Sequence, residues 1–479
     1  MPSLTPTSPR QVKLRRCSVF SPTLAQRAPA EVRAQIEQQG IDISKNIASI
    51  DIYESIFQNT IAASLKIRET HGFPEYFPLT GEEFIIIEFV TDYLGKERVF
   101  SRIFRIRRVG DVTFPKNEER VYTIDLVTPE FFNSLSLRVL KKYDNKTCVE
   151  AVKDVMQRYL EVPDAKMAAA HFEDTAGQIS AVIPNYTPLQ AINFFTALSL
   201  TKDTPHESNF LFFETLDGFY FTSIRKLIMD AKGIPDADLP KFSVNANKLT
   251  GNEKVTEQDA YNTIIGLHQE QTFDVLVDVS TGVLRSKMLH LDFFGRKWNE
   301  EDSRYTETFK KTTHLDEYPV YAENFDQSVS RNVKIFIVPT NIAVANSAYV
   351  SSVGEQLTPQ RLYESVVLRN RQLREIQHLR TVLDVPGQPN LRAGKVVILN
   401  YPSSRAIQNT TGNPSSPAVQ TPTPYHSGRH LVTSVRHNLT QVSLGVMEYR
   451  MHIEAVRDSF GAPLIGYKED VNDKDGKAV

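Results

Sequence analysis

Side chains that suit catalysis or metal binding are scattered along this sequence. Glu82 and Glu83 are adjacent carboxylates, and a glycosidase needs two carboxylates that flank the scissile bond. Neighbouring strand residues point to opposite faces of a sheet, so this pair cannot flank one bond. His426 and His430 have the i, i+4 spacing of metal ligands on a helix, yet they fall where a loop meets a strand. We expect no catalytic residue, no metal site and no cofactor.

The motifs and the composition also give no indication of catalysis or of a cofactor. The sequence has no phosphate-binding G-x-x-x-x-G-K-[ST] loop, G-x-G-x-x-G turn, G-x-S-x-G elbow or H-E-x-x-H pair. Its 479 residues suggest roughly three domains, and its net charge of -2 provides no general attraction for nucleic acid or anionic lipid. Two cysteines imply no disulfide framework. No apolar run is long enough to span a membrane, so we expect neither a specific nucleic-acid partner nor stable membrane insertion.

Basic side chains gather in two places that could contact a partner. Residues 1–30 contain five cations and no Asp or Glu, and we interpret residues 1–44 as an extended basic arm whose Arg15 and Arg16 dock on a neighbouring subunit. A mitochondrial presequence and a plain disordered tail are the alternatives. A second group lies on a predicted strand over 99–109 and fits a nucleic-acid stripe, a solvated strand face or an ion-paired subunit contact, of which the last two are favoured by the balanced charge; it comprises Arg102, Arg105, Arg107 and Arg108.

The elements that carry these residues begin with strands. Ile61, Ala63, Leu65 and Ile67 alternate with smaller or polar residues, which predicts a strand with one buried face. An almost wholly apolar run follows over 84–90 and predicts a strand covered on both faces. With further strands over 99–109 and 121–127, residues 45–140 are predicted to form a first tube-like β-barrel.

Two capping boxes mark helices after this barrel. Thr147 precedes Glu150 by three residues, and Thr187 precedes Gln190 in the same way. Residues 141–208 are therefore predicted to be an α/β insertion. The aromatic stretch 209–224 predicts a hairpin with Asp217 and Gly218 in a type I′ turn, and it opens a second barrel, whose first part is 209–245.

The remaining sequence divides into four predicted segments. Residues 246–350 form the second part of the insertion, with strand-like runs around Ser280–Gly282. Residues 351–384 form a helical segment with a broken heptad seam; it lies against a partner or covers a barrel, and its Arg369, Arg371 and Arg374 are candidate interface residues. Residues 385–462 supply the closing strands, and 463–479 form a mobile tail. The predicted class is α+β with two tube-like antiparallel barrels.

The order of these segments resembles a known family. The opening "IDIYESIFQNTIAASLKIRE" with "FPLTGEEFIIIEF", the aromatic hairpin, "VPGQPNLRAGKVVILNYP" and the ending "HLVTSVRHNL" with "YRMHIEAVRDSF" are similar to the baseplate central hub proteins of contractile-tailed phages. The similarity spans roughly residues 45–460. The basic arm and a long loop at 401–428 depart from the family pattern, which leaves open the neighbours that these two segments contact.

This resemblance implies a structural, non-enzymatic function in the virion. A homotrimer of two-barrel subunits would form a pseudo-sixfold ring that adapts the hexameric tail tube above to the trimeric central spike below, beside other baseplate proteins. Such a hub is assembled in the host cytoplasm and takes part in envelope penetration and DNA delivery. The hub of a tailocin or of a bacterial secretion machine, and a tail-tip envelope hydrolase, are the alternatives.

Overall fold

A computed structural model gives the fold of the protein. It describes residues 11–21, 23, 39–70, 79–94, 96–116, 119–204, 207, 209–244, 257–271, 273–292, 296–322, 325, 334–339, 368–401, 423, 425–443 and 446–463. The strands are β1 (Gln11–Phe20), β2 (Ile41–Asp42), β3 (Ile47–Ser55), β4 (Ala62–Glu69), β5 (Phe84–Tyr93), β6 (Lys96–Lys116), β7 (Glu119–Val127), β8 (Val139–Lys146), β9 (His171–Phe172), β10 (Ile179–Tyr186), β11 (Phe210–Glu214), β12 (Phe219–Ser223), β13 (Lys241–Ser243), β14 (Gly266–Gln271), β15 (Arg285–Asp292), β16 (Lys297–Arg304), β17 (Tyr318–Pro319), β18 (Lys334–Pro339), β19 (Leu379–Pro386), β20 (Val396–Asn400), β21 (Gly428–Ser443), β22 (Val446–Arg457) and β23 (Ser459–Phe460).

Helices are fewer and shorter. They are η1 (Ser44–Asn46), α4 (Pro129–Ser136), α5 (Cys148–Arg158), α6 (Asp164–Ala168), α7 (Pro188–Leu198), α8 (Ile224–Lys232), α9 (Glu257–Asn262), α10 (Val275–Thr281) and α11 (Tyr305–Phe309), and residues 368–375 are also helical. None of these helices has the length and apolarity that crossing a bilayer requires. The fold is mostly β-sheet with helices gathered beside it, which confirms the predicted α+β class.

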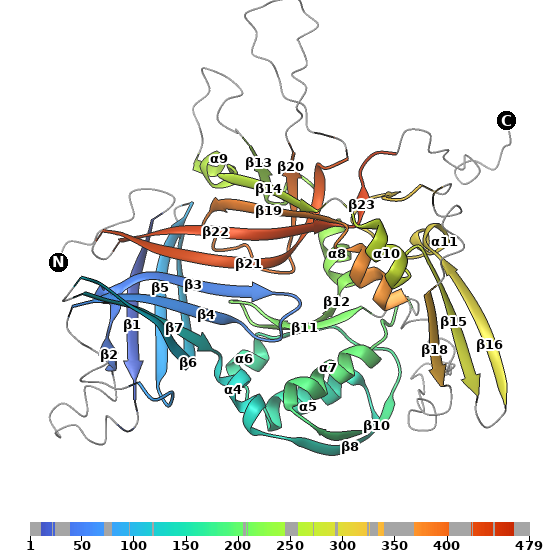
Figure 1. Cartoon of the computed structure of the whole chain (residues 1–479), viewed down its shortest axis with the longest axis horizontal. Coiled ribbons are helices and arrows are strands. Elements are labelled where there is room, and N and C mark those ends of the chain that lie inside the picture. The colour runs from blue at the N-terminus through green and yellow to red at the C-terminus, as the bar shows by residue number, and fades with distance from the viewer. Residues whose placement is uncertain are drawn as a thin grey trace, which may run out of the picture.

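Eight antiparallel strands close into a ring, which we call the first ring. Its order is β1-β5-β6-β7-β4-β3-β21-β22, and β22 pairs with β1 to complete the circle. Strands β1 to β7 of this ring lie on the left in Figure 1. The inward side chains alternate along each strand as predicted: Ala63, Leu65 and Ile67 of β4 are buried between exposed neighbours. On β5, the buried side chains alternate with half-buried ones, so only one face of that strand is fully covered.

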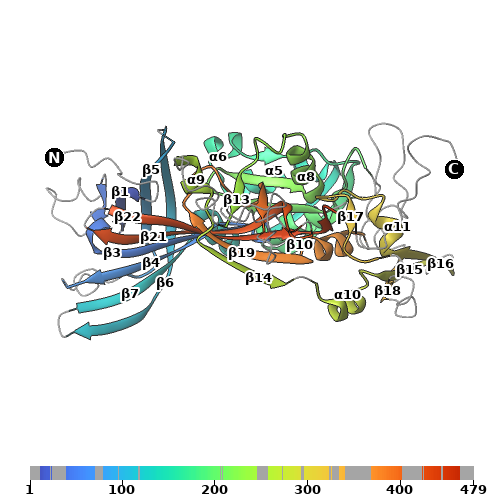
Figure 2. The ribbon, with the colours of Figure 1, turned by 90° about the horizontal axis from the view of Figure 1, so that it is seen from above.

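A second β unit continues from the same two strands. The open order β14-β19-β22-β21-β20-β13 uses the other ends of β21 and β22, and an isolated bridge from Ser243 to Thr263 links its margins. In β21, residues 434–440 pair with β3 of the first ring, whereas residues 428–431 pair with β20. The β21–β22 hairpin thus belongs to both units, and Figure 2 shows it running from one to the other.

These pairings correct the predicted domain limits. Residues 45–140 do not close a barrel alone, because β1 from the N-terminal segment and the C-terminal hairpin supply three of the eight ring strands. Residues 11–20 therefore lie inside the fold rather than in an extended arm. The segment 209–245 contributes only β13 to the main sheet, while β14, predicted within the insertion, pairs with β19. Long-range strand pairing leaves no local sequence signal, which explains these errors.

Helices α4–α7 and strands β8 and β10 form a lobe beside the first ring (Figure 1). Both predicted capping boxes are present: Thr147 and Glu150 begin α5, and Thr187 and Gln190 begin α7. Each box satisfies backbone N–H groups that have no partner within the helix. The buried faces of these helices form one core with four phenylalanines of the β11–β12 hairpin, namely Phe210, Phe212, Phe219 and Phe221.

The β11–β12 hairpin has a different turn from the one predicted. Thr215 and Gly218 exchange backbone hydrogen bonds of 2.9 and 3.2 Å, so the two turn residues are Leu216 and Asp217. Only Gly218, with φ +153°, has a positive φ in this turn, which is incompatible with type I′. The shift by one residue places Leu216 at the tip, where it is buried in the core of the first ring.

Two further predictions are wrong. Residues 275–281, predicted as strand, form α10, because Asp274 caps the helix N-terminus through Val277 N–H and Gly282 ends it in a left-handed conformation. Of the predicted helical segment 351–384, residues 351–367 lie outside the described residues, 368–375 are helical, and β19 replaces the expected helix from Leu379. The apparent seam residue Leu383 is instead a buried strand residue opposite Ile453.

Candidate functional site

A buried cluster of charged side chains joins the two β units, and we call it the Glu54 junction. Glu54 on β3 is 1% exposed and lies in the wall of the first ring. One carboxylate oxygen accepts the Leu216 N–H at 2.7 Å, and the other accepts the Ala393 N–H at 3.1 Å. The same side chain thereby holds the tip of the β11–β12 hairpin and the loop that precedes β20.

Arg392 and His437 complete the Glu54 junction. The Nε atom of Arg392 lies 3.8 Å from Glu54 and donates at 3.1 Å to Asp217, while Nε2 of His437 lies 3.3 Å from Glu54. Burial alone raises the pKa of a carboxyl group, but His437, Arg392 and the Leu216 N–H together hold the pKa of Glu54 below its usual value. An ionised, fully bonded carboxylate therefore fixes the joint, and nothing in this arrangement activates a nucleophile.

The predicted N-terminal interface residues bind within their own chain. Arg15 on β1 pairs with Glu88 at 3.5 Å and with Glu97 at 3.4 Å across the neighbouring strands. Arg16 donates to the Gln39 carbonyl at 2.8 Å. Both arginines thus contribute to strand packing around β1, and the rest of the predicted arm, residues 1–10 and 24–38, lies outside the described residues.

Arg369, Arg371 and Arg374 also have partners within the chain. Arg371 is 3% exposed and donates to the carbonyls of Arg304 and Ser303 at 3.2 and 3.1 Å, so it cannot face a neighbouring subunit. Arg374 pairs with Asp278 at 3.2 Å, and Arg369 donates to the Phe210 carbonyl at 2.9 Å. These side chains attach the partly buried helix 368–375 to the rest of the fold.

Thr312, His314 and Asp458 are arranged like the hydroxyl, imidazole and carboxylate of a catalytic triad. The Thr312 hydroxyl lies 2.8 Å from Nε2 of His314, whose Nδ1 lies 2.9 Å from Asp458. The hydroxyl, however, donates to the Thr308 carbonyl at 3.0 Å, so it must accept from Nε2. Burial lowers the pKa of His314, but the Asp458 carboxylate outweighs it and raises that pKa above the usual value. A doubly protonated ring that donates at both nitrogens cannot act as a general base.

Glu82, Glu83 and His430, which were first considered for catalysis or metal binding, have hydrogen-bond partners within the fold. Glu83 is 2% exposed and accepts the Thr80 and Gly81 N–H groups at 3.0 and 2.8 Å, so it stabilises the bend before β5. Glu82 accepts the Thr23 hydroxyl at 2.7 Å. Burial lowers the pKa of His430 to about 3, which leaves a neutral ring beside the Gly428 carbonyl. Within the described ranges no group of three or more metal-ligating side chains occurs.

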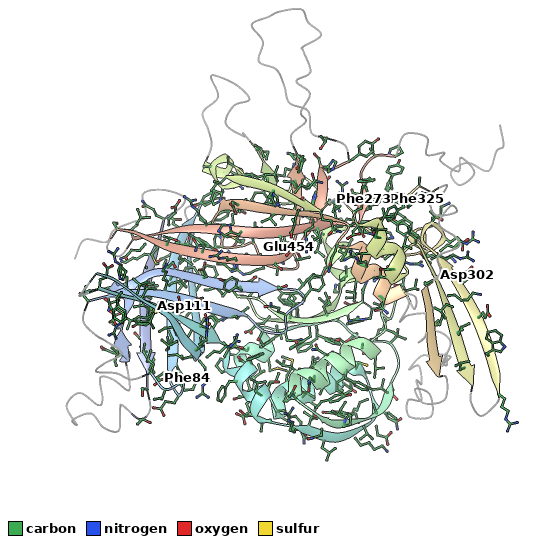
Figure 3. All side chains as sticks on the ribbon, in the orientation of Figure 1. Phe84, Asp111, Phe273, Asp302, Phe325 and Glu454 are labelled. Atoms are coloured by element: carbon green, nitrogen blue, oxygen red, sulfur yellow. The ribbon has the colours of Figure 1, made fainter. Side chains whose placement is uncertain are left out.

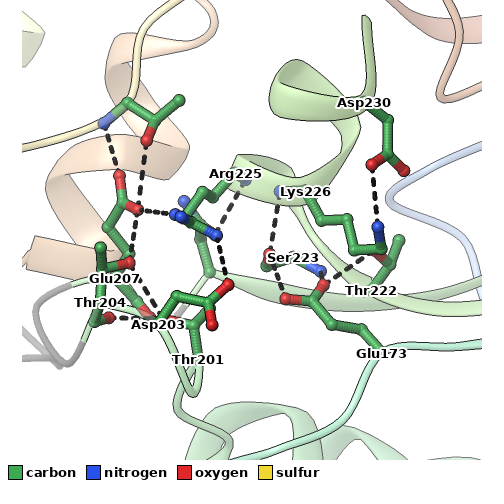
Figure 4. A network of polar contacts seen from close by, with 12 residues as sticks. Glu173, Thr201, Asp203, Thr204, Glu207, Thr222, Ser223, Arg225, Lys226 and Asp230 are labelled. Atoms are coloured by element: carbon green, nitrogen blue, oxygen red, sulfur yellow. Dashed lines mark hydrogen bonds and ion pairs between the residues drawn. The ribbon is translucent and has the colours of Figure 1, made fainter. Parts of the chain in front are cut away.

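A second polar network secures α8 against the sheet that carries it (Figure 4). Glu173 accepts the Ser223 N–H at 2.6 Å and the hydroxyls of Thr222 and Ser223 at 2.9 and 3.0 Å. Glu207, 1% exposed, pairs with Arg225 at 2.8 Å and accepts the Thr204 hydroxyl at 2.9 Å. Each carboxylate is saturated by donors from its own chain, so these residues support the fold.

The outer face of β6 differs from all these sites because it exposes apolar side chains. Val99 is 50% exposed and Ile103 49% exposed, and Phe114 near the end of the strand is 64% exposed. A groove of about 520 Å³ separates this face from α4 and α6; its apolar lining includes Phe20, Phe84, Ile86, Ile103, Pro129, Leu160 and Pro163. Figure 3 shows Phe84 on the side of the first ring that faces the helical lobe. Apolar strand residues left uncovered are typical of a subunit contact.

Sequence reasoning missed the Glu54 junction entirely. Glu54, His437 and Arg392 are far apart in the sequence, and each falls in a segment predicted only as a strand or loop. A signal was nevertheless present: Glu54 occupies an inward position of an alternating strand, two residues after the buried Ile52. A carboxylate at such a position needs a partner when it is buried.

Of the four arginines on the predicted basic strand over 99–109, Arg105 lies over the rings of Phe84 and Phe132, at 4.5 and 3.9 Å from their centroids.

Comparison with known proteins gives matches among solved structures alone. No family model and no curated sequence matches the chain. The 43 kDa tail protein of prophage MuSo2 from Shewanella oneidensis is similar with a TM-score of 0.48 and 10% identity, over 86% of this chain and 95% of that one. A tail protein from Neisseria meningitidis MC58 is similar with a TM-score of 0.46 and 11% identity, over 94% and 99% of the two chains.

A third similar structure comes from a secretion apparatus. The Escherichia coli c3393 protein, a component of the type VI secretion system, has a TM-score of 0.37 and 8% identity, over 86% of this chain and 73% of that one. These three structures are thus of two tail proteins and one component of a secretion system.

Proposed function

We propose that the protein is a structural hub of a contractile tail or a related injection machine. The observation that carries this proposal is the β21–β22 hairpin, which belongs to two β units of one chain. A single subunit thereby presents two curved sheets in a fixed relation. Three such subunits would offer six sheets to a sixfold tube and three identical surfaces to a trimeric spike, which is the symmetry change that the sequence resemblance implies.

The proposed mechanism needs rigidity rather than bond breaking. The Glu54 junction fixes the angle between the two units, since a buried, fully bonded ion cluster tolerates little displacement. The exposed apolar face of β6 supplies a surface for contact with a neighbouring subunit. In this function the hub closes the tube around its lumen, and it transmits the movement of the contracting sheath to the spike during envelope penetration and DNA delivery.

Solution mass tests the proposal most directly. The full chain should form a trimer by multi-angle light scattering when it is mixed with the spike protein encoded nearby, because binding of a partner favours the assembled state by mass action. Electron microscopy of the complex should show a ring with six similar densities. A monomeric or tetrameric hub in the complex would contradict the proposal.

The tailocin or secretion-machine hub shares this mechanism, and the identity of neighbouring genes separates it from a phage hub. The hydrolase alternative predicts clearing of a peptidoglycan zymogram. Such clearing by purified hub, retained after removal of contaminating lysozyme activity, would contradict the non-enzymatic proposal.

A further inference from the structure

A cleft of about 680 Å³ opens beside the Glu54 junction, and we call it the basic cleft. It lies between β6, the tip of the β11–β12 hairpin and the loop before β20. Its lining contains four cations and one carboxylate, with a few neutral residues between them: Arg98, Val99, Phe100, Ser101, Arg102, Leu216, Asp217, Pro389, Asn390, Arg392 and Lys395.

The four cations of the basic cleft are not equivalent. Arg392 is 1% exposed, and its charge is matched by Glu54 and Asp217. Arg102 donates to the Leu216 carbonyl, a neutral group. Within the part of the chain that the structure describes, no carboxylate lies within ion-pair distance of Arg98, Arg102 or Lys395. Arg98 and Lys395 are exposed, and the Asp217 carboxylate in the lining accepts from Arg392, so an anionic ligand can pair with both exposed cations.

We infer that the basic cleft binds an acidic polypeptide segment of a protein partner. Arg98 and Lys395 are exposed and lie on different elements that both line the cleft, so they can grip a carboxylate from two sides. Val99, half exposed beside them, offers an apolar contact to the carbon atoms of such a segment. Apolar contact next to charge-assisted hydrogen bonds is the composition of a protein interface.

Nucleic acid fits the basic cleft less well. A duplex carries one phosphate charge per roughly 1.7 Å of its axis and is held by a continuous basic track. Here the cations are confined to one cleft and form no continuous track. The chain as a whole has a net charge of -2. Charge complementarity thus favours separate carboxylates over a phosphate backbone.

The test measures binding of fluorescein-labelled decaglutamate to the full-length protein by fluorescence anisotropy. Arg98→Glu with Lys395→Glu should weaken binding by roughly tenfold or more, because both changes replace attraction by repulsion. Lys13→Glu with Lys66→Glu, which changes the same net charge on exposed strand residues of the first ring, should leave the affinity unchanged. Arg102 stays unaltered, because it supports the hairpin tip.

Each other outcome overturns the inference. Equal loss in both double variants would show attraction to the overall charge, and absence of binding to the unaltered protein would show that the cleft takes no acidic segment. Tighter binding of a ten-residue oligothymidylate, abolished by the cleft variant, would assign the site to nucleic acid. Displacement of decaglutamate by millimolar inorganic phosphate would assign it to a free anion.

Two further measurements keep these results interpretable. If the charge reversals lower the melting temperature, the neutral pair Arg98→Gln with Lys395→Gln should still weaken binding several-fold. The inference does not depend on the proposed trimer. A monomeric protein that binds decaglutamate through the cleft retains the inference, and a trimer that does not bind it contradicts the inference alone.

Discussion

The Glu54 junction and the outer face of β6 lie close together, but they differ in the burial and the pairing of their side chains. In the Glu54 junction the buried Glu54 carboxylate accepts from two backbone N–H groups and lies beside Arg392 and His437. On the β6 face, Val99 and Ile103 are half exposed, and the nearby Arg98 has no described carboxylate partner. The first region is complete within one chain, whereas the second gains from a partner. Stability and assembly should therefore respond to different mutations.

Removing β1 should have the largest effect on the completed part of the molecule. Deletion of residues 2–20 removes the strand between β5 and β22, together with the buried Val12, Cys17 and Val19. At about 1.5–3 kcal/mol for each buried apolar side chain, the loss of unfolding free energy should reach at least about 5 kcal/mol. Urea denaturation followed by circular dichroism measures it.

The matched control for this deletion is the removal of residues 2–10, which leaves β1 intact. It should change the unfolding free energy by less than about 0.5 kcal/mol. If the longer deletion unfolds at the same urea concentration as the control, β1 is not required to close the first ring.

Breaking the Glu54 junction should cost nearly as much. Arg392→Leu leaves the buried Glu54 carboxylate without its main cation, and loss of one partner of a buried ion pair costs about 3–5 kcal/mol. Arg436→Leu is the control, because Arg436 pairs with Asp51 on the surface, where ion pairs contribute about 0–1 kcal/mol. Equal urea midpoints for the two variants would refute the distinction between the buried junction and the surface.

A further prediction concerns the pH dependence of stability, and it involves Glu214 at the end of β11, between the two regions. Burial raises its pKa to about 7, although Lys166 at 3.5 Å acts in the opposite direction. The folded protein then binds a proton that the unfolded chain has lost, so stability falls as the pH rises from about 5 to about 8. The loss should be on the order of 3 kcal/mol.

Melting curves of Glu214→Gln across this pH range should be flatter than those of the unaltered protein. Glu97→Gln, at an exposed position, should reproduce the unaltered slope. A Glu214→Gln protein that retains the full pH dependence would show that another group titrates.

The smallest effect on stability is expected on the β6 face. Ile103→Glu should change the unfolding free energy of the monomer by less than about 0.5 kcal/mol, because its side chain is already half exposed. It should nevertheless block association, since a carboxylate cannot be buried in an apolar contact without a partner. Light scattering of the complex with the spike measures this, with Val442→Glu, at an exposed site on β21, as the control.

Features that depend on neighbouring residues were predicted correctly from the sequence. Contacts between distant segments were not predicted. The boxes at Thr147 and Thr187, the alternation from Ile61 to Ile67 and the buried aromatic hairpin were all predicted, because each depends on residues within a few positions. The pairing of β1 with β22 and the place of Glu54 beside Arg392 depend on contacts across most of the chain. Neither leaves a periodic pattern, so neither was predicted.

The three arginines of helix 368–375 show that predicted interface residues can also have partners within their own chain. The spacing of Arg369, Arg371 and Arg374 suggested an exposed decoration, yet these side chains extend into the fold to reach carbonyl oxygens and Asp278. A guanidinium carries five donors and an apolar stem, so it can be buried wherever backbone acceptors are available. Charge in the sequence is therefore a poor guide to the surface.

Because the first ring needs β21 and β22 to join β3 to β1, its closure must wait until residue 457 has been synthesised. Roughly 290 residues separate the last residue before β8 from the start of β21, and ribosomes add about 5–20 residues per second. For some 15–60 seconds, β1 and β3 would therefore present open hydrogen-bonding edges on a nascent polypeptide. Such edges attract other strands, so a chaperone that shields them should raise the yield of native protein, and circular permutants that join residue 463 to residue 11 should fold with fewer aggregates.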